Sequence, residues 1–381
     1  MTTSAPGKLM LFGEHAVVYG YPSIVTAISL PAGEAGLPAQ AGERLYVTTT
    51  DTGYTGDTKF LDAAVRAWGK SDTKLYAKSV FSGKYGFGSS SAVTVAALKM
   101  LRPEASNREL FDAAYNIVLK IQGTGSGFDV AAAAFGGTLY FIKGGKVIEP
   151  LAVSTIPLVV GYTGVKADTK ALVADVAAKH SREPAKVDRI FAAIGKIVYS
   201  AKEKVVEGDW ERVGKLMDYN QEYLRDLGVS SEKLEALIVA AKGAGAWGAK
   251  LSGAGGGDCM IALAPPDKRQ SVEDAIAKSG GEVVHATANA QGVRIETTDN
   301  QEELFIVVDR DDRILGYKTR WECHHDKSLI HRTVGALIFN DKGQLFLQKR
   351  SMTKDMEGGL WGISAAGHVT KGQTDEEAVH R

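Results

Sequence analysis

The residues best suited to chemistry in this 381-residue chain lie in and around its glycine-rich segments. One of them, residues 82–92, has three glycines followed by three serines, directly before an apolar stretch that Pro103 ends. Glycines allow a tight turn and the close approach of a ligand, and any of these serines could cap a following helix. Because a helix start offers unpaired N–H groups and the positive end of a dipole, the segment predicts a phosphate-binding loop. An ordinary Gly/Ser turn is the alternative, and no Gly-Lys-Ser/Thr closes the segment as in a Walker loop.

Charged side chains accompany two other segments. Lys8 begins a predicted, mostly buried strand over residues 8–12, and Glu14 and His15 lie in the turn that leaves it. They are either solvated charges or the lining of a cleft beside the glycine loop. Asp129 follows three alternating glycines; it is either a helix cap or, if it faces the phosphate loop, a candidate base.

A third glycine run, residues 253–257, lies between two predicted strands. Four glycines among five residues indicate backbone packed against backbone or against a ligand.

Composition excludes several classes of protein. Lys+Arg 45 against Asp+Glu 45 gives no net charge, so nothing favours a nucleic-acid or membrane-surface partner. Cys259 and Cys323 are the two cysteines, which argues against a disulfide framework and fits a cytoplasmic protein. No signal-peptide pattern opens the chain, and no apolar run approaches the length of a membrane span. With 44% hydrophobic residues, two or three domains are expected.

The elements that must position these residues follow from hydrophobic periodicity and from turn residues. Helices are expected over residues 59–68, 92–101, 109–120, 187–207, 210–226, 231–243, 268–279 and 374–381, with another beginning at residue 168. Strands are expected over residues 44–50, 138–142, 158–162, 282–287, 304–308, 333–340 and 344–349, and a loop over residues 31–43.

The glycine segments, taken in this order, resemble the motifs of the GHMP kinases, which include galactokinase and homoserine, mevalonate and phosphomevalonate kinases. The resemblance is carried by residues 6–8 with 13–15, by residues 86–90 and by residues 253–257. It implies an α+β fold, with an N-terminal domain like the second domain of ribosomal protein S5 and a ferredoxin-like C-terminal domain. The implied domains are residues 1–150 and 151–296, followed by a linker over 297–303 and a partial Nudix-like α/β domain over 304–381.

Within that family the chain is most similar to the mevalonate kinases, through residues 13–20, 220–221, 227–229 and 244–250. The similarity implies phosphorylation of mevalonate to 5-phosphomevalonate, with ATP and Mg²⁺ as cofactors, and it leaves a homodimer open. It also implies roles for residues. Asp129 would take the proton of the substrate hydroxyl, and Lys8 would lower the pKa of that hydroxyl and offset phosphate charge. Gly86, Phe87, Gly88, Ser89, Ser90 and Ser91 would hold the phosphates, with Ser90 also on Mg²⁺; Glu14, His15 and Thr169 would contact mevalonate; Gly253, Gly255 and Gly256 would support the phosphate loop.

Two departures from the pattern keep alternatives open. Val118 stands where mevalonate kinases usually have a metal-binding Glu, which leaves open a catalytically weak nucleotide-binding protein. Residues 84–88, 125–129 and 257–259 look more like phosphomevalonate kinase. Its phosphorylated substrate would need extra positive charge, which could come from Lys84, Lys166 or Lys170.

Residues 304–381 resemble the start of a Nudix domain, as in organic-diphosphate hydrolases and the related isopentenyl-diphosphate isomerase. The resemblance is carried by residues 316–320, 331–332, 359–361, Gly367 and Arg381. Gln373 replaces a usual Glu, residues 364–366 lack the isomerase cysteine, and the sequence stops before the metal-binding glutamates, so no catalysis is expected here. A bifunctional enzyme with a longer chain is the alternative. Cys323, His324 and His325 suggest a metal site, but a surface turn is the favoured interpretation.

Overall fold

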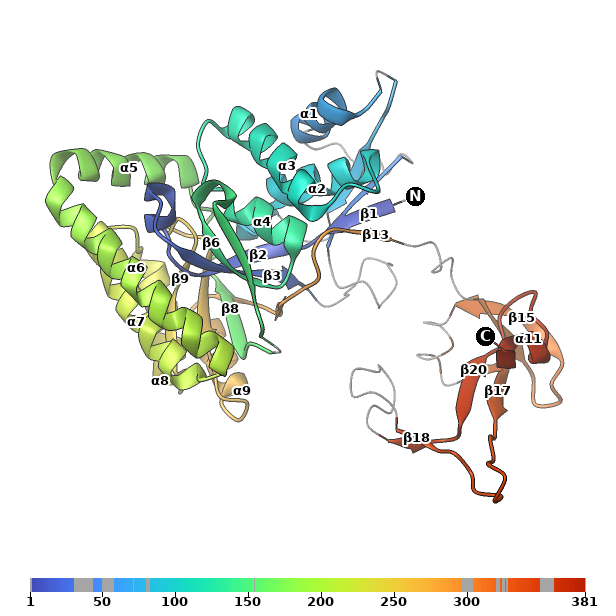
Figure 1. Ribbon diagram of the computed structural model, residues 1–381. Coiled ribbons are helices and arrows are strands. Elements are labelled where there is room, and N and C mark those ends of the chain that lie inside the picture. Colours follow the sequence, from blue (N-terminus) through green and yellow to red (C-terminus); the bar gives the residue numbers. More distant parts are fainter. Residues whose placement is uncertain are drawn as a thin grey trace. The chain divides into compact units, whose positions relative to one another are not determined.

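The computed structural model describes residues 2–30, 44–49, 58–70, 72–79, 83–153, 155–296, 304–319, 323, 326, 328–349 and 360–380. The chain divides into two compact units, Met1–Glu296 and Thr297–Arg381 (Figure 1). The expected loop over 31–43 and linker over 297–303 lie outside the described residues. The expected domain boundary after residue 150 stays a prediction.

Two antiparallel sheets form the framework of the first part of Met1–Glu296. One has the order β13-β1-β4-β5, and the other has the order β12-β3-β6-β7 with β2 paired to β3. Their strands are β1 (Thr2–Ala5), β2 (Gly7–Phe12), β3 (Ser23–Ser29), β4 (Leu45–Thr48), β5 (Tyr76–Ser79), β6 (Thr138–Ile142), β7 (Val147–Leu151), β12 (Thr287–Ala288) and β13 (Arg294–Glu296). The four residues after Lys8 in β2 are all buried, as their continuous apolar run predicts.

Four helices accompany these sheets: α1 (Lys59–Trp68), α2 (Ser89–Leu101), α3 (Asn107–Gln122) and α4 (Phe128–Phe135). The central one, α2, is buried along most of its length, because it packs on α1, α3 and α4 and on strands β1 and β4. Ser106 and Glu109 form a capping box at the start of α3, which therefore begins two residues before the expected position.

A second antiparallel sheet system, of order β11-β8-β10-β9, follows in the chain. It comprises β8 (Leu158–Tyr162), β9 (Gly248–Ser252), β10 (Cys259–Leu263) and β11 (Glu282–Val284), accompanied by α5 (Thr169–Arg182), α6 (Pro184–Glu207), α7 (Trp210–Leu227), α8 (Glu232–Gly243) and α9 (Arg269–Lys278) (Figure 1). Pro184 opens α6, and Gly208, at φ 72°, ends it. A single hydrophobic core runs through Met1–Glu296.

The expected single strand over residues 282–287 is wrong, because this stretch holds two strands in different sheets. Glu282 pairs with Tyr162 in the second sheet system, whereas Thr287 pairs with Ser29 in the first. The buried Arg44 holds the segment that follows β12. Its Nη1 donates to the Gln291 carbonyl (2.7 Å), and its Nε donates to Ser4 Oγ of β1 (2.7 Å).

The unit Thr297–Arg381 is built from short strands. These are β14 (Leu304–Val308), β15 (Ile314–Thr319) and β16 (Ile330–His331) in one sheet, β17 (Thr333–Ala336) with β20 (Ala365–His368), and β18 (Gln348–Lys349) with β19 (Trp361–Gly362). The expected strands over 333–340 and 344–349 are therefore too long. The final helix, α11 (Asp375–His380), lies where expected. Among the described residues of the whole chain, no helix is both long and apolar enough to cross a membrane.

Candidate active site

A cavity of about 440 Å³ opens within Met1–Glu296, at the level of the glycine-rich segments. Its walls come from β2 and the turn after it, the starts of α2, α4 and α5, one face of α3, and the loop after β9. Most of the residues singled out from sequence line it: Lys8, Glu14, His15, Gly86, Gly88, Ser89, Ser90, Asp129, Thr169 and Gly253. Segments far apart in the sequence therefore meet at one site.

Lys8 and Asp129 converge on Gly88. A Cβ built on Gly88 would lie 3.2 Å from Lys8 Cε and 3.6 Å from Asp129 Cβ, so both side chains contact this point of the glycine loop. The Lys8 ammonium donates to the Gly86 carbonyl (2.8 Å). Burial lowers the pKa of Lys8, and the nearby Asp129 and Asp258 carboxylates act against that shift.

Asp129 is the second residue of α4, and Gly127, at φ 93°, precedes the helix as its N-cap. The helix start favours a negative charge there. The buried Ser91 hydroxyl donates to Asp129 Oδ2 (2.8 Å), and the Val130 N–H donates to Oδ1 (3.0 Å). These contacts orient the carboxylate beside Lys8.

The glycine loop leads into α2 without a side-chain cap. Gly88 is the N-cap residue at φ 80°, and none of the three serines accepts a capping hydrogen bond there, so the expected serine cap is wrong. Ser91 binds Asp129 instead, while Ser89 and Ser90 line the cavity. An uncapped helix start leaves N–H groups available for an anion, as the phosphate-loop prediction requires.

Phe87 lies behind the cavity wall. Its side chain is buried, and its carbonyl accepts from the Lys8 N–H (3.0 Å). Phe87 therefore ties the loop to β2 and does not face the cavity.

The turn after β2 is tightly constrained. Gly13 has φ 98°, and a Cβ there would lie 2.6 Å from Ser23 Cβ. Glu14 is buried and pairs with the equally buried Lys250 of β9. His15 has φ 58°, and its Nε2 lies 2.9 Å from the Ala254 carbonyl; burial lowers the pKa of His15.

The third glycine run contacts other parts of the wall. A Cβ on Gly255 would overlap the Val229 carbonyl, and one on Gly256 would lie 2.9 Å from Leu172 of α5. Of this run, Gly253 and Ala254 line the cavity. Asp258, directly after the run, lies against the phosphate loop, where a Cβ on Gly86 would overlap it.

The three lysines that could bind a second phosphate have different surroundings. Lys84 does not line the cavity, and its Nζ lies 2.8 Å from Glu282 Oε2. Lys166 lines the cavity but lies 3.3 Å from Asp258, whereas Lys170 lines it at the start of α5.

Candidate metal ligands are few. Val118 is buried and lines the cavity with an apolar surface. In the part of the chain that the structure describes, no three His, Cys, Asp or Glu side chains gather as a metal cluster. Cys323 is buried, while His324 and His325 lie outside the described residues.

Two buried residues behind the cavity wall, Lys250 and Asn220, were not predicted as functional residues from the sequence. Lys250 was noted only as part of a motif, although a lysine within an apolar strand is a sign of a buried partner. Asn220 is likewise part of a motif, but no local pattern marks its contact with Gly13, 207 positions away, whose N–H donates to Asn220 Oδ1 (3.4 Å).

Comparison with known proteins bears on the whole of Met1–Glu296. The family model described as GHMP kinases N terminal domain matches residues 58–137, and that described as GHMP kinases C terminal matches residues 201–282. A mevalonate kinase of Pyrococcus horikoshii is 38% identical over 327 residues, covering 77% of this chain and 97% of the relative. A mevalonate kinase of Thermococcus gammatolerans is 36% identical over 329 residues, with the same coverage. The chain belongs to the GHMP kinase family.

Within that family, the similarity is to mevalonate kinases in structure as well as in sequence. The L. major mevalonate kinase in complex with R-mevalonate is 26% identical with a TM-score of 0.63, covering 77% of this chain and 97% of that one. The Methanococcus jannaschii mevalonate kinase is 26% identical with a TM-score of 0.62, covering 76% of this chain and 98% of that one. The Streptococcus pneumoniae phosphomevalonate kinase shares the fold at 18% identity. The expected α+β kinase fold is confirmed.

The NUDIX domain model matches residues 329–381, which confirms the second resemblance.

Proposed function

We propose that Met1–Glu296 transfers the terminal phosphoryl group of ATP to mevalonate, giving 5-phosphomevalonate. The observation that carries this proposal is that Lys8 and Asp129 both contact Gly88, in the glycine loop that leads into the uncapped start of α2. Its chemical class is supported by membership of the GHMP kinases, and its substrate by relatives of 36–38% identity that are mevalonate kinases.

The arrangement suits phosphoryl transfer, in which the protein mainly positions the reactants and stabilises charge. The start of α2 would hold the phosphates of ATP, with Gly86, Gly88, Ser89 and Ser90 facing them. Asp129, oriented by Ser91, would accept the proton of the attacking hydroxyl. Lys8 would stabilise the developing negative charge on that oxygen and on the phosphoryl group.

Mg²⁺ is the expected companion of ATP, and it would neutralise the charge of the phosphates. The apolar Val118 and the lack of an acidic cluster among the described residues do not fit an ion held by protein carboxylates. They fit an ion that enters with the nucleotide and is held mainly by its phosphates, to which the Ser90 hydroxyl would add one oxygen.

Phosphomevalonate as the acceptor is less well supported. Lys84 contacts Glu282 away from the cavity lining, and Lys166 shares its charge with Asp258. Lys170 lines the cavity, and among the described residues no carboxylate forms an ion pair with it. A cytoplasmic location and a homodimer stay predictions.

A coupled ADP-release assay that offers mevalonate and phosphomevalonate side by side tests the proposal. We expect turnover with mevalonate and little with phosphomevalonate. The reverse preference would replace mevalonate with its phosphate as the acceptor. Inactivity on both, with ATP still bound, would support a nucleotide-binding protein instead of a kinase.

A further inference from the structure

The buried ion pair between Glu14 and Lys250 lies in the wall of the cavity. Both side chains are 0% exposed, and they come from residues 236 positions apart in the sequence. The Lys250 ammonium donates to Glu14 Oε1 and to the Leu251 carbonyl. Removing two charges from water is unfavourable, and burying a pair of charges stabilises a fold poorly compared with apolar packing. Such a pair is therefore a candidate for a functional role.

The two oxygens of the Glu14 carboxylate have different surroundings. Oε1 accepts from Lys250, whereas no well-formed hydrogen bond reaches the buried Oε2 among the described residues. Glu14 also lines the cavity. A buried carboxylate oxygen without a donor is unfavourable, so a hydroxyl group entering the cavity would complete its hydrogen bonding.

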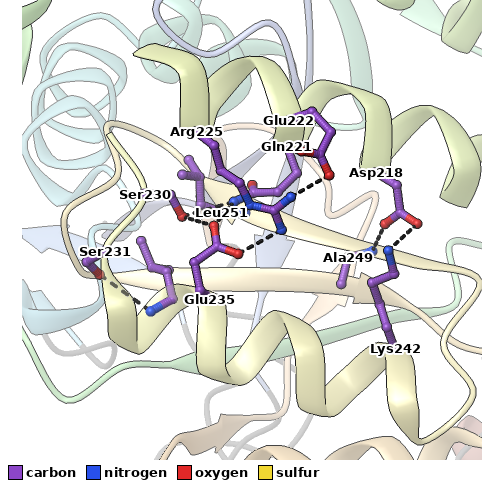
Figure 2. A network of polar contacts seen from close by, with 11 residues as sticks. Asp218, Gln221, Glu222, Arg225, Ser230, Ser231, Glu235, Lys242, Ala249 and Leu251 are labelled. Atoms are coloured by element: carbon purple, nitrogen blue, oxygen red, sulfur yellow. Dashed lines mark hydrogen bonds and ion pairs between the residues drawn. The ribbon is translucent and has the colours of Figure 1, made fainter. Parts of the chain in front are cut away.

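Strand β9, which carries Lys250, is held along both of its edges. It pairs with β10 along one edge, and side chains of α7 replace a neighbouring strand along the other (Figure 2). Asp218 Oδ1 accepts from the Ala249 N–H (3.1 Å), and Gln221 Oε1 accepts from the Leu251 N–H (3.0 Å). The peptide groups on both sides of Lys250 are thus fixed.

Gln221 is itself held in this network. Its Nε2 donates to Ser230 (2.9 Å) and to Glu235 (2.8 Å), and Arg225 bonds Glu235 from the other side (Figure 2). The same helix reaches the turn that carries Glu14, through Asn220 and the Gly13 N–H. One helix therefore fixes both halves of the ion pair.

We propose that Lys250 is a positioning residue, which keeps Glu14 ionised inside the cavity and its Oε2 available to a hydroxyl group of the acceptor substrate. The inference rests on the proposed function, in which that acceptor is mevalonate. Lys250 itself does not touch the substrate in this arrangement; it acts through Glu14.

Electrostatics supports the assignment. Burial raises the pKa of Glu14, and Lys250 is the main influence that lowers it, with smaller contributions from the backbone of Glu14 and Gly253. His15, next in the chain, is buried and its pKa is lowered, which favours the neutral ring. The other charged groups around the cavity are Lys8 on β2, Asp129 on α4, Asp258 after the glycine run, Lys59, Lys166 and Lys170. Without Lys250, the pKa of Glu14 would rise further, so the carboxylate would form only at higher pH.

The test is Lys250→Met in the full chain, with kcat and KM for mevalonate and for ATP measured between about pH 5.5 and 9. We expect the KM for mevalonate to rise about tenfold or more near neutral pH and to recover as the pH increases, since each unit of pKa shift is a tenfold change. The KM for ATP should stay within about twofold of the wild type, because Lys250 acts on the acceptor side.

Lys242→Met is the matched control. Lys242 belongs to the same network and lies 2.7 Å from Asp218 Oδ2, but its side chain is 43% exposed and does not line the cavity (Figure 2). We expect it to keep the wild-type pH profile. Thermal unfolding of each variant shows whether it is folded.

A second variant keeps the inference testable if Lys250→Met does not fold. Glu14→Gln should raise the KM for mevalonate and remove its dependence on pH at the acidic end. A folded Lys250→Met with the wild-type pH profile would overturn the inference, as would a Glu14→Gln that keeps the acidic limb. Absence of mevalonate turnover in the wild-type chain would instead overturn the proposed function, and this inference with it.

Discussion

The two units of this chain differ in how they bury apolar and charged side chains. Met1–Glu296 has one continuous core, and the pair Glu14–Lys250 beside its cavity is fully buried. In Thr297–Arg381 the described residues form two small clusters, on the two faces of β14, around Ile306 and around Phe305. Large apolar side chains there remain exposed: Leu315 (68%), Trp361 (66%) and Phe346 (59%).

The comparison indicates that a charged side chain can be buried only inside a large, well-packed core. A buried ammonium or carboxylate is tolerated only where many packed groups hold its partners in place. The first unit meets this condition, through the sheets and helices around its cavity. The second unit does not, within the residues described, and its exposed apolar side chains are of the kind that mark contact surfaces.

The largest effect is expected from Asp129→Asn. If all phosphoryl transfer occurs in the first unit, removing its proposed base should lower kcat with mevalonate about 10²- to 10⁴-fold. ATP affinity should change little, since Asp129 acts on the acceptor hydroxyl. The ADP-release assay and equilibrium binding of an ATP analogue measure the two quantities.

The control for Asp129→Asn is Asp312→Asn in the second unit, where Asp312 pairs with Arg332 at 3.0 Å on the surface. It should leave kcat unchanged. Substantial turnover remaining in Asp129→Asn would show that another group is the base.

The next effect concerns stability and compares two phenylalanines. Phe141 of β6 is fully buried, so Phe141→Ala should lower the free energy of unfolding by about 3–5 kcal/mol. Phe346 is 59% exposed, and Phe346→Ala should change it by no more than about 0.5 kcal/mol. Calorimetry can separate the unfolding of the two units, because an ATP analogue should raise the unfolding temperature of Met1–Glu296 alone. Similar losses in the two variants would contradict the contrast between the cores.

The sequence predicted the parts of the site that depend on local chemistry. Gly13 and Gly86 have positive φ angles and close neighbours, as glycine motifs require, and Lys8 and Asp129 meet at the loop between them. The pair Glu14–Lys250 could not be predicted in the same way, because it joins a turn and a strand that only the packed fold brings together.

Two of the errors of secondary structure concern where an element begins or ends. No local pattern marks the point between Val284 and Thr287 where the chain leaves one sheet for another. The serine cap failed because α2 begins at Ser89, so Gly88 takes the N-cap position and all three serines lie inside the first turn. Propensity favours a serine at the N-cap but does not decide at which residue the helix begins.

A smaller effect is expected from pH, and it depends on charge burial in the first unit. Burial lowers the pKa of Lys8 from its ordinary value of 10.5. The ammonium exists below that lowered pKa and is lost as the pH rises through it, so kcat should fall on the alkaline side before pH 10.5 is reached. The kcat–pH profile of the wild type measures this limb.

Lys371→Met provides the comparison for this limb, since Lys371 is exposed in the second unit. Its profile should match the wild type. Lys8→Met should lose most activity, and what remains should lack the alkaline limb. A limb that persists in Lys8→Met would assign the titration to another group.

The smallest effect on catalysis is expected from removing residues 297–381. The described residues that line the cavity all belong to Met1–Glu296, and that unit has its own continuous core, so the shortened chain should fold and keep kcat and both KM values within about twofold. Residues 297–381 expressed alone should bind a hydrophobic dye and unfold over a broad range, because their described clusters are small and their apolar side chains exposed. A large loss of kcat in residues 1–296 would mean that the second unit supports the catalytic one. The two units would then depend on each other for catalysis, despite their different cores.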